Sequence, residues 1–102
     1  DGHDDHEHDD FDSIVVDIPE QSDPVDLVAK IERLANDHNI LRVKGYASVT
    51  GKPMRLLVQA VGARVRHQFD RPWAVDEHRQ GRLVVIAEHD DIDRAIIESA
   101  LA

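Results

Sequence analysis

Residues 40–69, ILRVKGYASVTGKPMRLLVQAVGARVRHQF, decide the fold, because apolar and polar side chains alternate along much of this stretch. A period of two predicts β-strands. Within residues 40–49, one face is predicted to carry Leu41, Val43, Gly45, Ala47 and Val49, and the other Arg42, Lys44, Tyr46 and Ser48. TGKP at 50–53 predicts a turn. Two more strands, 54–62 and 63–69, are predicted to join at Gly62, with one bent strand as the alternative.

The residues before this stretch predict a strand and a helix. In FDSIVVDIPE at 11–20 the period of two returns, and Pro19 ends the strand. Ser22 or Asp23 is predicted to be the N-cap of the helix that follows, with Pro24 in its first turn. Its apolar stripe consists of Leu27, Val28, Ile31, Leu34 and Ala35.

The residues after it predict a loop, a strand and a second helix. DRPWAVDEHRQG at 70–81 has Pro72 and Gly81 as breakers, and RLVVIAEH at 82–89 is a strand. Asp90 or Asp91 is predicted to cap a helix to the end of the chain. Its apolar positions are Ile92, Ala95, Ile96 and Leu101.

These elements predict an α+β fold of order β-α-β-β-β-β-α. The hairpin connections in the middle favour a mainly antiparallel sheet of four to five strands, with two helices on one face. Residues 1–10 are predicted to form a separate tail, and residues 11–102 the folded domain.

Several classes of function lack their sequence signals. The chain has no Cys, no Gly-x-Ser-x-Gly, and no Gly-rich dinucleotide motif. TGKP lacks the earlier glycine and the later Ser or Thr of a phosphate-binding loop, so we expect no nucleotide hydrolysis by this chain and no enzymatic activity. We expect neither a membrane span nor a leader, and a cytoplasmic location. Because the sequence starts at Asp1 without Met, we expect a fragment of a longer protein.

Two single residues in the second half of the chain have alternative interpretations. His67 has the parity of Val65 and Phe69, which predicts a packing residue near the core rather than a metal ligand. Trp73 is predicted to cover one edge of the core, with a partner-binding anchor as the alternative.

The charge is uneven along the chain. The net charge is −9, yet residues 40–82 contain nine of the twelve Lys and Arg. Arg42, Lys44, Arg64 and Arg66 are predicted to form a basic stripe on the sheet face opposite the helices, where an acidic partner would bind. The stripe has only Tyr46 as an aromatic neighbour and the protein is acidic, which argues against nucleic acid as the partner.

The tail, DGHDDHEHDD, has three histidines and six carboxylates in ten residues. Imidazole and carboxylate ligands suit Zn, Ni, Cu and Co. His3, His6 and His8 are therefore candidate metal ligands, together with Asp4, Asp5 and Glu7. The alternative is an acidic linker that only keeps the protein in solution.

Four features between Asn39 and Leu101 carry a resemblance to a known family. They are Leu-Arg-Val-Lys-Gly at 41–45, Gln59 with Val61-Gly62, Trp73, and VVIAEHDDID at 84–93. In their order and spacing they resemble the C-terminal domain of the CobW family. The proteins of this family are GTPases associated with metal trafficking. A His/Asp-rich linker just before this domain is common in the family.

The resemblance implies an accessory domain of a metallochaperone GTPase, with a tail that captures or buffers divalent metal. The metal would be cobalt for cobalamin biosynthesis, or zinc. The family's GTP site and Cys-containing metal motif belong to its GTPase domain, and none of those residues maps onto this chain. The implied partners are the GTPase domain of the same polypeptide, a metal-requiring client enzyme, or a second copy. The alternative is a protein-interaction module with a solubilising tail.

Overall fold

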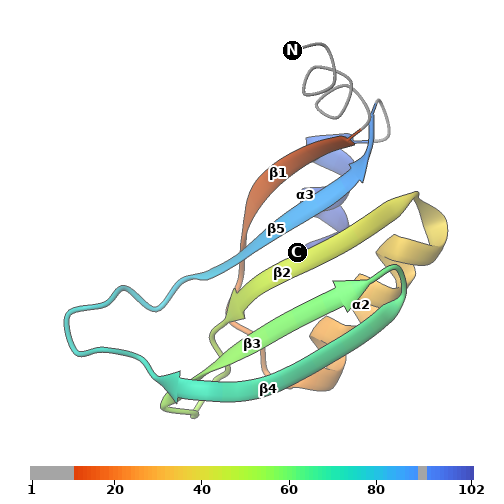
Figure 1. Cartoon of the computed structure of the whole chain (residues 1–102). Helices are drawn as coiled ribbons and strands as arrows, with labels where there is room; N and C mark the ends of the chain where they lie inside the picture. Colours follow the sequence, from red (N-terminus) through yellow and green to blue (C-terminus); the bar gives the residue numbers. More distant parts are fainter. Residues whose placement is uncertain (1–10, 90–91) are drawn as a thin grey trace, which may run out of the picture.

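The computed structural model of the chain describes residues 11–89 and 92–102 (Figure 1). The elements follow the predicted order, β-α-β-β-β-β-α. The strands are β1 (Phe11–Ile18), β2 (Ile40–Ala47), β3 (Met54–Val61), β4 (Arg64–Pro72) and β5 (Gly81–Glu88). The helices are α2 (Pro24–Asp37) and α3 (Arg94–Leu101). The prediction of an α+β fold with a mainly antiparallel sheet is confirmed.

The five strands form one sheet in the order β1-β5-β2-β3-β4, with every neighbouring pair antiparallel. Strands β2, β3 and β4 form a meander, and β5 returns to lie between β2 and β1. Because β1 and β2 both run antiparallel to β5, they are parallel to each other, and α2 makes the connection between them. Both helices lie behind the sheet in Figure 1, so the other face is open.

The core lies between the sheet and the helices. α2 packs against β2 and β4, α3 packs against β1, and the two helices contact each other. The helices bury Leu27, Ile31, Leu34, Ile97 and Leu101, and the sheet buries Val16, Val43, Val58, Leu83 and Val85. Full burial of each such side chain contributes roughly 1.5–3 kcal/mol. Within the described residues, no helix is long and apolar enough to cross a membrane.

Helix α2 begins as predicted, because Asp23 is its N-cap and accepts a hydrogen bond from the Val25 amide at 2.9 Å. The second predicted helix, α3, is present, but its predicted N-cap was wrong. Its N-cap is Asp93, which accepts a hydrogen bond from the amide of Ile96 at 3.2 Å, rather than Asp90 or Asp91.

The later start of α3 goes with a different buried face. Ile97 and Leu101 are one helical turn apart and fully buried, whereas Ile96 is exposed at the surface. Ala95 is exposed too. Both had been predicted to belong to the apolar stripe, but a helix that starts at Arg94 directs them away from the sheet.

A β-bulge changes the predicted pattern in β2. The register with β5 shifts between Ile40 and Arg42, so Ile40 is buried and Leu41 only half-buried. A strict period of two assigns Leu41 to the core face. An extra residue in one strand moves the residue before it to the other parity, which a strict period of two does not anticipate.

Strands β3 and β4 are separate, and Gly62 lies in the turn between them with φ of 56°. β4 continues to Pro72, so the loop predicted at 70–81 begins only at Trp73. His67 is exposed, and its predicted place near the core was wrong. β4 is one of the two edge strands of the sheet, so its side chains have a neighbouring strand on one side only.

Candidate functional site

The open face of the sheet carries its side chains in rows that cross all five strands. One row consists of Val15, Val84, Lys44, Gln59 and Arg66, in the order of the strands. The adjacent row consists of Ser13, Ile86, Arg42, Val61 and Arg64. Because directly opposed residues in a sheet have Cβ atoms about 4.5–5.5 Å apart, these rows are continuous surfaces.

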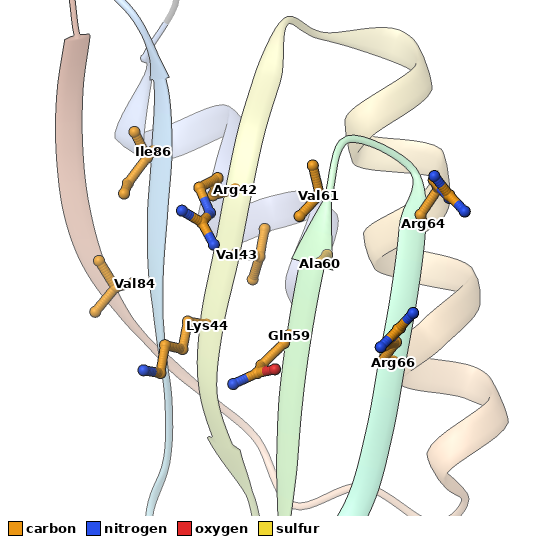
Figure 2. Close-up of a pocket in the computed structure, with 10 residues that line it drawn as sticks. All are labelled: Arg42, Val43, Lys44, Gln59, Ala60, Val61, Arg64, Arg66, Val84 and Ile86. Atoms are coloured by element: carbon orange, nitrogen blue, oxygen red, sulfur yellow. The ribbon is translucent and has the colours of Figure 1, made fainter.

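The members of the two rows on β5, β2, β3 and β4 line an open groove of about 650 Å³. Figure 2 shows the basic side chains that line it, from β2 and β4, with Gln59 between the two strands' cations and Arg64 at the outer edge of β4. Its apolar part comes from Val61, Val84 and Ile86. Val61 is 60% exposed and Val84 38% exposed, so apolar surface that a partner could bury lies beside the cations.

We name Arg42, Lys44, Arg64 and Arg66 the basic strip. Among residues 11–89 and 92–102, none of these four side chains forms a salt bridge or a side-chain hydrogen bond. The next cations on the same face are already paired, since Arg82 binds Asp17 at 2.8 Å and Arg55 binds Asp70. The basic strip is therefore the part of this face that is able to accept an external anion.

The Arg55–Asp70 pair lies at one end of the face. Arg55 donates to both carboxylate oxygens of Asp70 at 2.8–3.0 Å, and its guanidinium lies 3.6 Å from the ring centroid of Tyr46. The register between β3 and β4 shifts here, and the bulge brings Asp70 beside Arg55. The hydrogen bonds from Arg55 lower the pKa of Asp70, and Asp70 in turn raises the pKa of Arg55.

The loop after β4 is held by a second pair. Arg71 donates to both oxygens of Glu77 at 2.9 and 3.0 Å, and the Ala74 amide donates to the same carboxylate at 2.9 Å. The hydrogen bonds from Arg71, followed by the one from Ala74, lower the pKa of Glu77 to about 2. These contacts fix the start of the loop from Trp73 to Gln80.

Trp73 is half-buried in this loop, with the guanidinium of Arg79 5.8 Å from its ring centroid. Its buried Nε1 has no hydrogen-bond partner among the described residues. Arg79 donates to the Ser48 hydroxyl at 2.9 Å and to the Lys52 carbonyl at 2.8 Å. The guanidinium of Arg79 thereby ties this loop to the turn between β2 and β3.

The structure brings all four predicted cations together, and they do project from the face opposite the helices (Figure 2). Their role in binding a partner stays a prediction. The candidate metal ligands His3, His6 and His8, with Asp4, Asp5 and Glu7, lie outside the described residues. In the part of the chain that the structure does describe, no three His, Cys, Asp or Glu side chains are grouped to hold a metal ion.

Sequence reasoning missed the apolar part of the groove. The signal was present, because Val84 and Ile86 have the opposite parity to the buried Leu83 and Val85. The sequence pattern does not say that β5 lies next to β2, and only this adjacency brings these two side chains beside Lys44 and Arg42.

The chain is similar to longer proteins. It is 47% identical to the zinc chaperone CobW of Sinorhizobium sp., over 94% of this chain and 27% of that protein. It is 50% identical to the zinc chaperone CobW of Pseudomonas aeruginosa, over 87% of this chain and 23% of that protein. The chain thus spans about a quarter of the length of these relatives.

Solved structures show the same fold. The Zn(II)-bound YjiA GTPase from E. coli superposes with a TM-score of 0.71 at 28% identity, over 98% of this chain and 31% of that one. A Zn(II)-bound triple mutant of the YjiA GTPase superposes with a TM-score of 0.70 at 32% identity, over 89% of this chain and 28% of that one.

The family model described as the cobalamin synthesis protein CobW C-terminal domain matches residues 11–102. This match covers every element of the sheet and both helices. The chain belongs to the family of CobW C-terminal domains.

Proposed function

We propose that this chain is the accessory domain of a CobW-type metallochaperone GTPase, and that its basic strip docks an acidic surface of the GTPase domain of the same polypeptide. The observation that carries the proposal is a strip of four cations without an anionic partner among the described residues, next to exposed apolar side chains, on a protein of net charge −9. Unpaired cations beside apolar surface are suited to an acidic protein surface, because charges orient the partner and apolar burial supplies affinity.

The relatives support the parent class. Those named zinc chaperone are about four times as long as this chain, and the related solved structures are GTPases with bound zinc. Among the described residues, no nucleotide-binding loop and no metal cluster is found, so hydrolysis and metal selection would belong to the rest of the parent protein. The accessory domain would contribute a docking surface.

The tail adds metal handling to this proposal. His3, His6 and His8 would capture or buffer the divalent cargo, zinc or cobalt, before it reaches the GTPase domain. The neighbouring carboxylates Asp4, Asp5 and Glu7 would supply further oxygen ligands. The rival function is an interaction module whose tail only solubilises it, and the metal titration described in the Discussion separates the two.

The docking proposal is tested by charge reversal in the strip. Arg64→Glu with Arg66→Glu should weaken binding of the chain to the GTPase domain of its parent protein by about tenfold or more, equivalent to about 1.4 kcal/mol. The wild-type affinity should fall as salt rises, and the affinity of the variant should depend on salt much less. Calorimetry at several salt concentrations measures both effects.

Lys30→Glu with Arg33→Glu is the matched control. It makes the same change in net charge on α2, which covers the other face of the sheet. This control should leave the affinity close to that of the wild type. Equal affinities of wild type and the Arg64/Arg66 variant, with both folded by circular dichroism, would contradict the proposal.

A further inference from the structure

The unpaired cations of the basic strip and the carboxylates of residues 1–10 belong to the same chain. Residues 1–10 carry six carboxylates and no Lys or Arg. The strip carries four cations that have no ion pair with any residue in 11–89 or 92–102. The two segments are therefore complementary in charge.

The topology attaches the acidic segment at the edge of the basic face. Residues 1–10 join the sheet at Phe11, the first residue of β1. Two residues further on, Ser13 begins the row that runs through Ile86, Arg42 and Val61 to Arg64. The last three members of the row are thus reached from β1 by crossing β5.

The distances fit this connection. Strands in a sheet are about 4.8 Å apart, so Arg42 lies about 10 Å from β1 along the row and Arg64 about 19 Å. Ten extended residues span up to about 33 Å. The acidic segment is long enough to reach every cation of the strip.

The route across the face is compatible with such a segment. It passes the apolar side chains of Val15, Val84 and Ile86, which lie between the point where the tail joins β1 and the cations. The residue opposite Phe11 in the register is a carboxylate, Glu88. The anions that β1 and β4 contribute to this face, Asp17 and Asp70, are already neutralised by Arg82 and Arg55.

We propose that the acidic segment 1–10 binds the basic strip of its own domain and competes there with any acidic partner. A segment tethered this closely acts at an effective concentration of the order of millimolar, so even a contact of millimolar strength is about half formed. An acidic partner then has to displace the segment, and this raises the affinity that it needs. The inference goes beyond the proposed function, and its test contains neither metal nor GTPase domain.

The absence of Cys makes the test direct. Gly2→Cys introduces a single thiol without changing the charge of the tail, and an uncharged nitroxide label is attached to it. Paramagnetic broadening of the amide signals of the full chain is then recorded at low salt. The informative amides are Gln59 in β3 and Arg66 in β4, because they lie far from the point of attachment at Phe11.

We expect the signals of Gln59 and Arg66 to lose about half of their intensity at low salt. The intensity should return at about 1 M salt, where the screening length is about 3 Å. It should also return, at Gln59 and at the amide of position 66, in the same labelled chain with Arg42→Gln, Arg64→Gln and Arg66→Gln. The control, Lys30→Gln with Arg33→Gln, removes two cations from α2 and should keep the broadening.

Three results would overturn the inference. Broadening confined to residues near Phe11 at every salt concentration would mean that the tail does not reach the strip. Broadening that persists in the strip variant would mean that the cations do not hold it. Broadening that arises only between a labelled chain and a second, isotope-labelled chain would assign the face to a second copy.

Discussion

At the residue scale, Gly45 is the position in β2 where a side chain is least tolerated. A Cβ built there would overlap the carbonyl oxygen of Arg82 and lie 2.9 Å from the Cα of Leu83. These are backbone atoms of β5, which pairs with β2 along the centre of the sheet. The close approach of the two strands is what holds Val84 and Ile86 beside Lys44 and Arg42.

Gly45→Ala should therefore destabilise the domain. Backbone atoms cannot move aside as a side chain end can, so the two strands must separate, and overpacking of this kind costs about 1–3 kcal/mol or more. Urea unfolding measures the loss. The control is Gly62→Asn, since nothing lies within 4 Å of a Cβ at Gly62 and Asn tolerates its φ of 56°. An unchanged unfolding free energy for Gly45→Ala would refute this account of the β2–β5 contact.

At the scale of elements, the loop from Trp73 to Gln80 is organised by the carboxylate of Glu77. It accepts three hydrogen bonds, two from Arg71 in β4 and one from the amide of Ala74. The bonds of Arg79 to the Ser48 hydroxyl and the Lys52 carbonyl attach the loop to the turn before β3. The acidic group that orders the loop is thus one whose charge depends on pH.

Stability should depend on pH through Glu77. Its pKa falls from 4.5 to about 2 in the folded protein, so the unfolded chain binds a proton at higher pH than the folded one. The stabilisation is complete above pH 4.5 and is lost as the pH falls through about 2. Glu77→Gln should therefore be less stable than wild type at neutral pH, and the difference should shrink over this interval.

Urea unfolding at a series of pH values, followed by the fluorescence of Trp73, measures this difference. The control is Asp76→Asn, because the Asp76 carboxylate forms no ion pair or side-chain hydrogen bond with a described residue. A stability difference between wild type and Glu77→Gln that is constant from neutral pH to pH 2 would show that the Glu77 charge does not hold the loop.

At the scale of the whole molecule, charge is divided between regions with different proposed roles. The basic strip lies on the open face of the sheet, while the tail adds six carboxylates and three histidines before β1 begins. The described part of the chain has no cluster of metal ligands, so the proposed metal capture depends on the tail. Metal binding and folding should then be nearly independent.

The chain should bind Zn, Ni or Co weakly through His3, His6 and His8, with proton release. Binding should weaken as the pH drops through about 6.5, where imidazole becomes protonated, and should favour Ni or Cu over Co. Titration calorimetry of the wild type and of the triple His→Ala variant measures this, and heat should be lost in the variant. Equal heats would leave the tail as a linker only.

The same preparation tests whether the metal lies outside the core. A ligand that binds the folded and unfolded states equally well does not change stability. The unfolding midpoint of residues 11–102 should therefore hardly change when the metal is added. A large rise in the midpoint would place the metal site within the fold.

The sequence by itself determined the elements that depend on local pattern. A period of two in residues 11–18 and 40–47 and an apolar stripe at 27–35 predicted β1, β2 and α2, because side-chain direction along a strand or helix repeats regularly. The same parity argument placed Arg42, Lys44, Arg64 and Arg66 on one face before the strand order was known. The charge and histidine content of the tail also come from the sequence alone.

Tertiary structure decided which elements are neighbours, since strand pairing joins residues far apart in the chain. The insertion of β5 between β1 and β2 brings Val84 and Ile86 to the basic strip. The bulge at Ile40–Arg42 reverses the predicted place of Leu41, and Asp93 begins α3 later than Asp90 or Asp91 would. Pairing also decided which cations are available, because Arg82 finds Asp17 and Arg55 finds Asp70 only across neighbouring strands of the folded sheet.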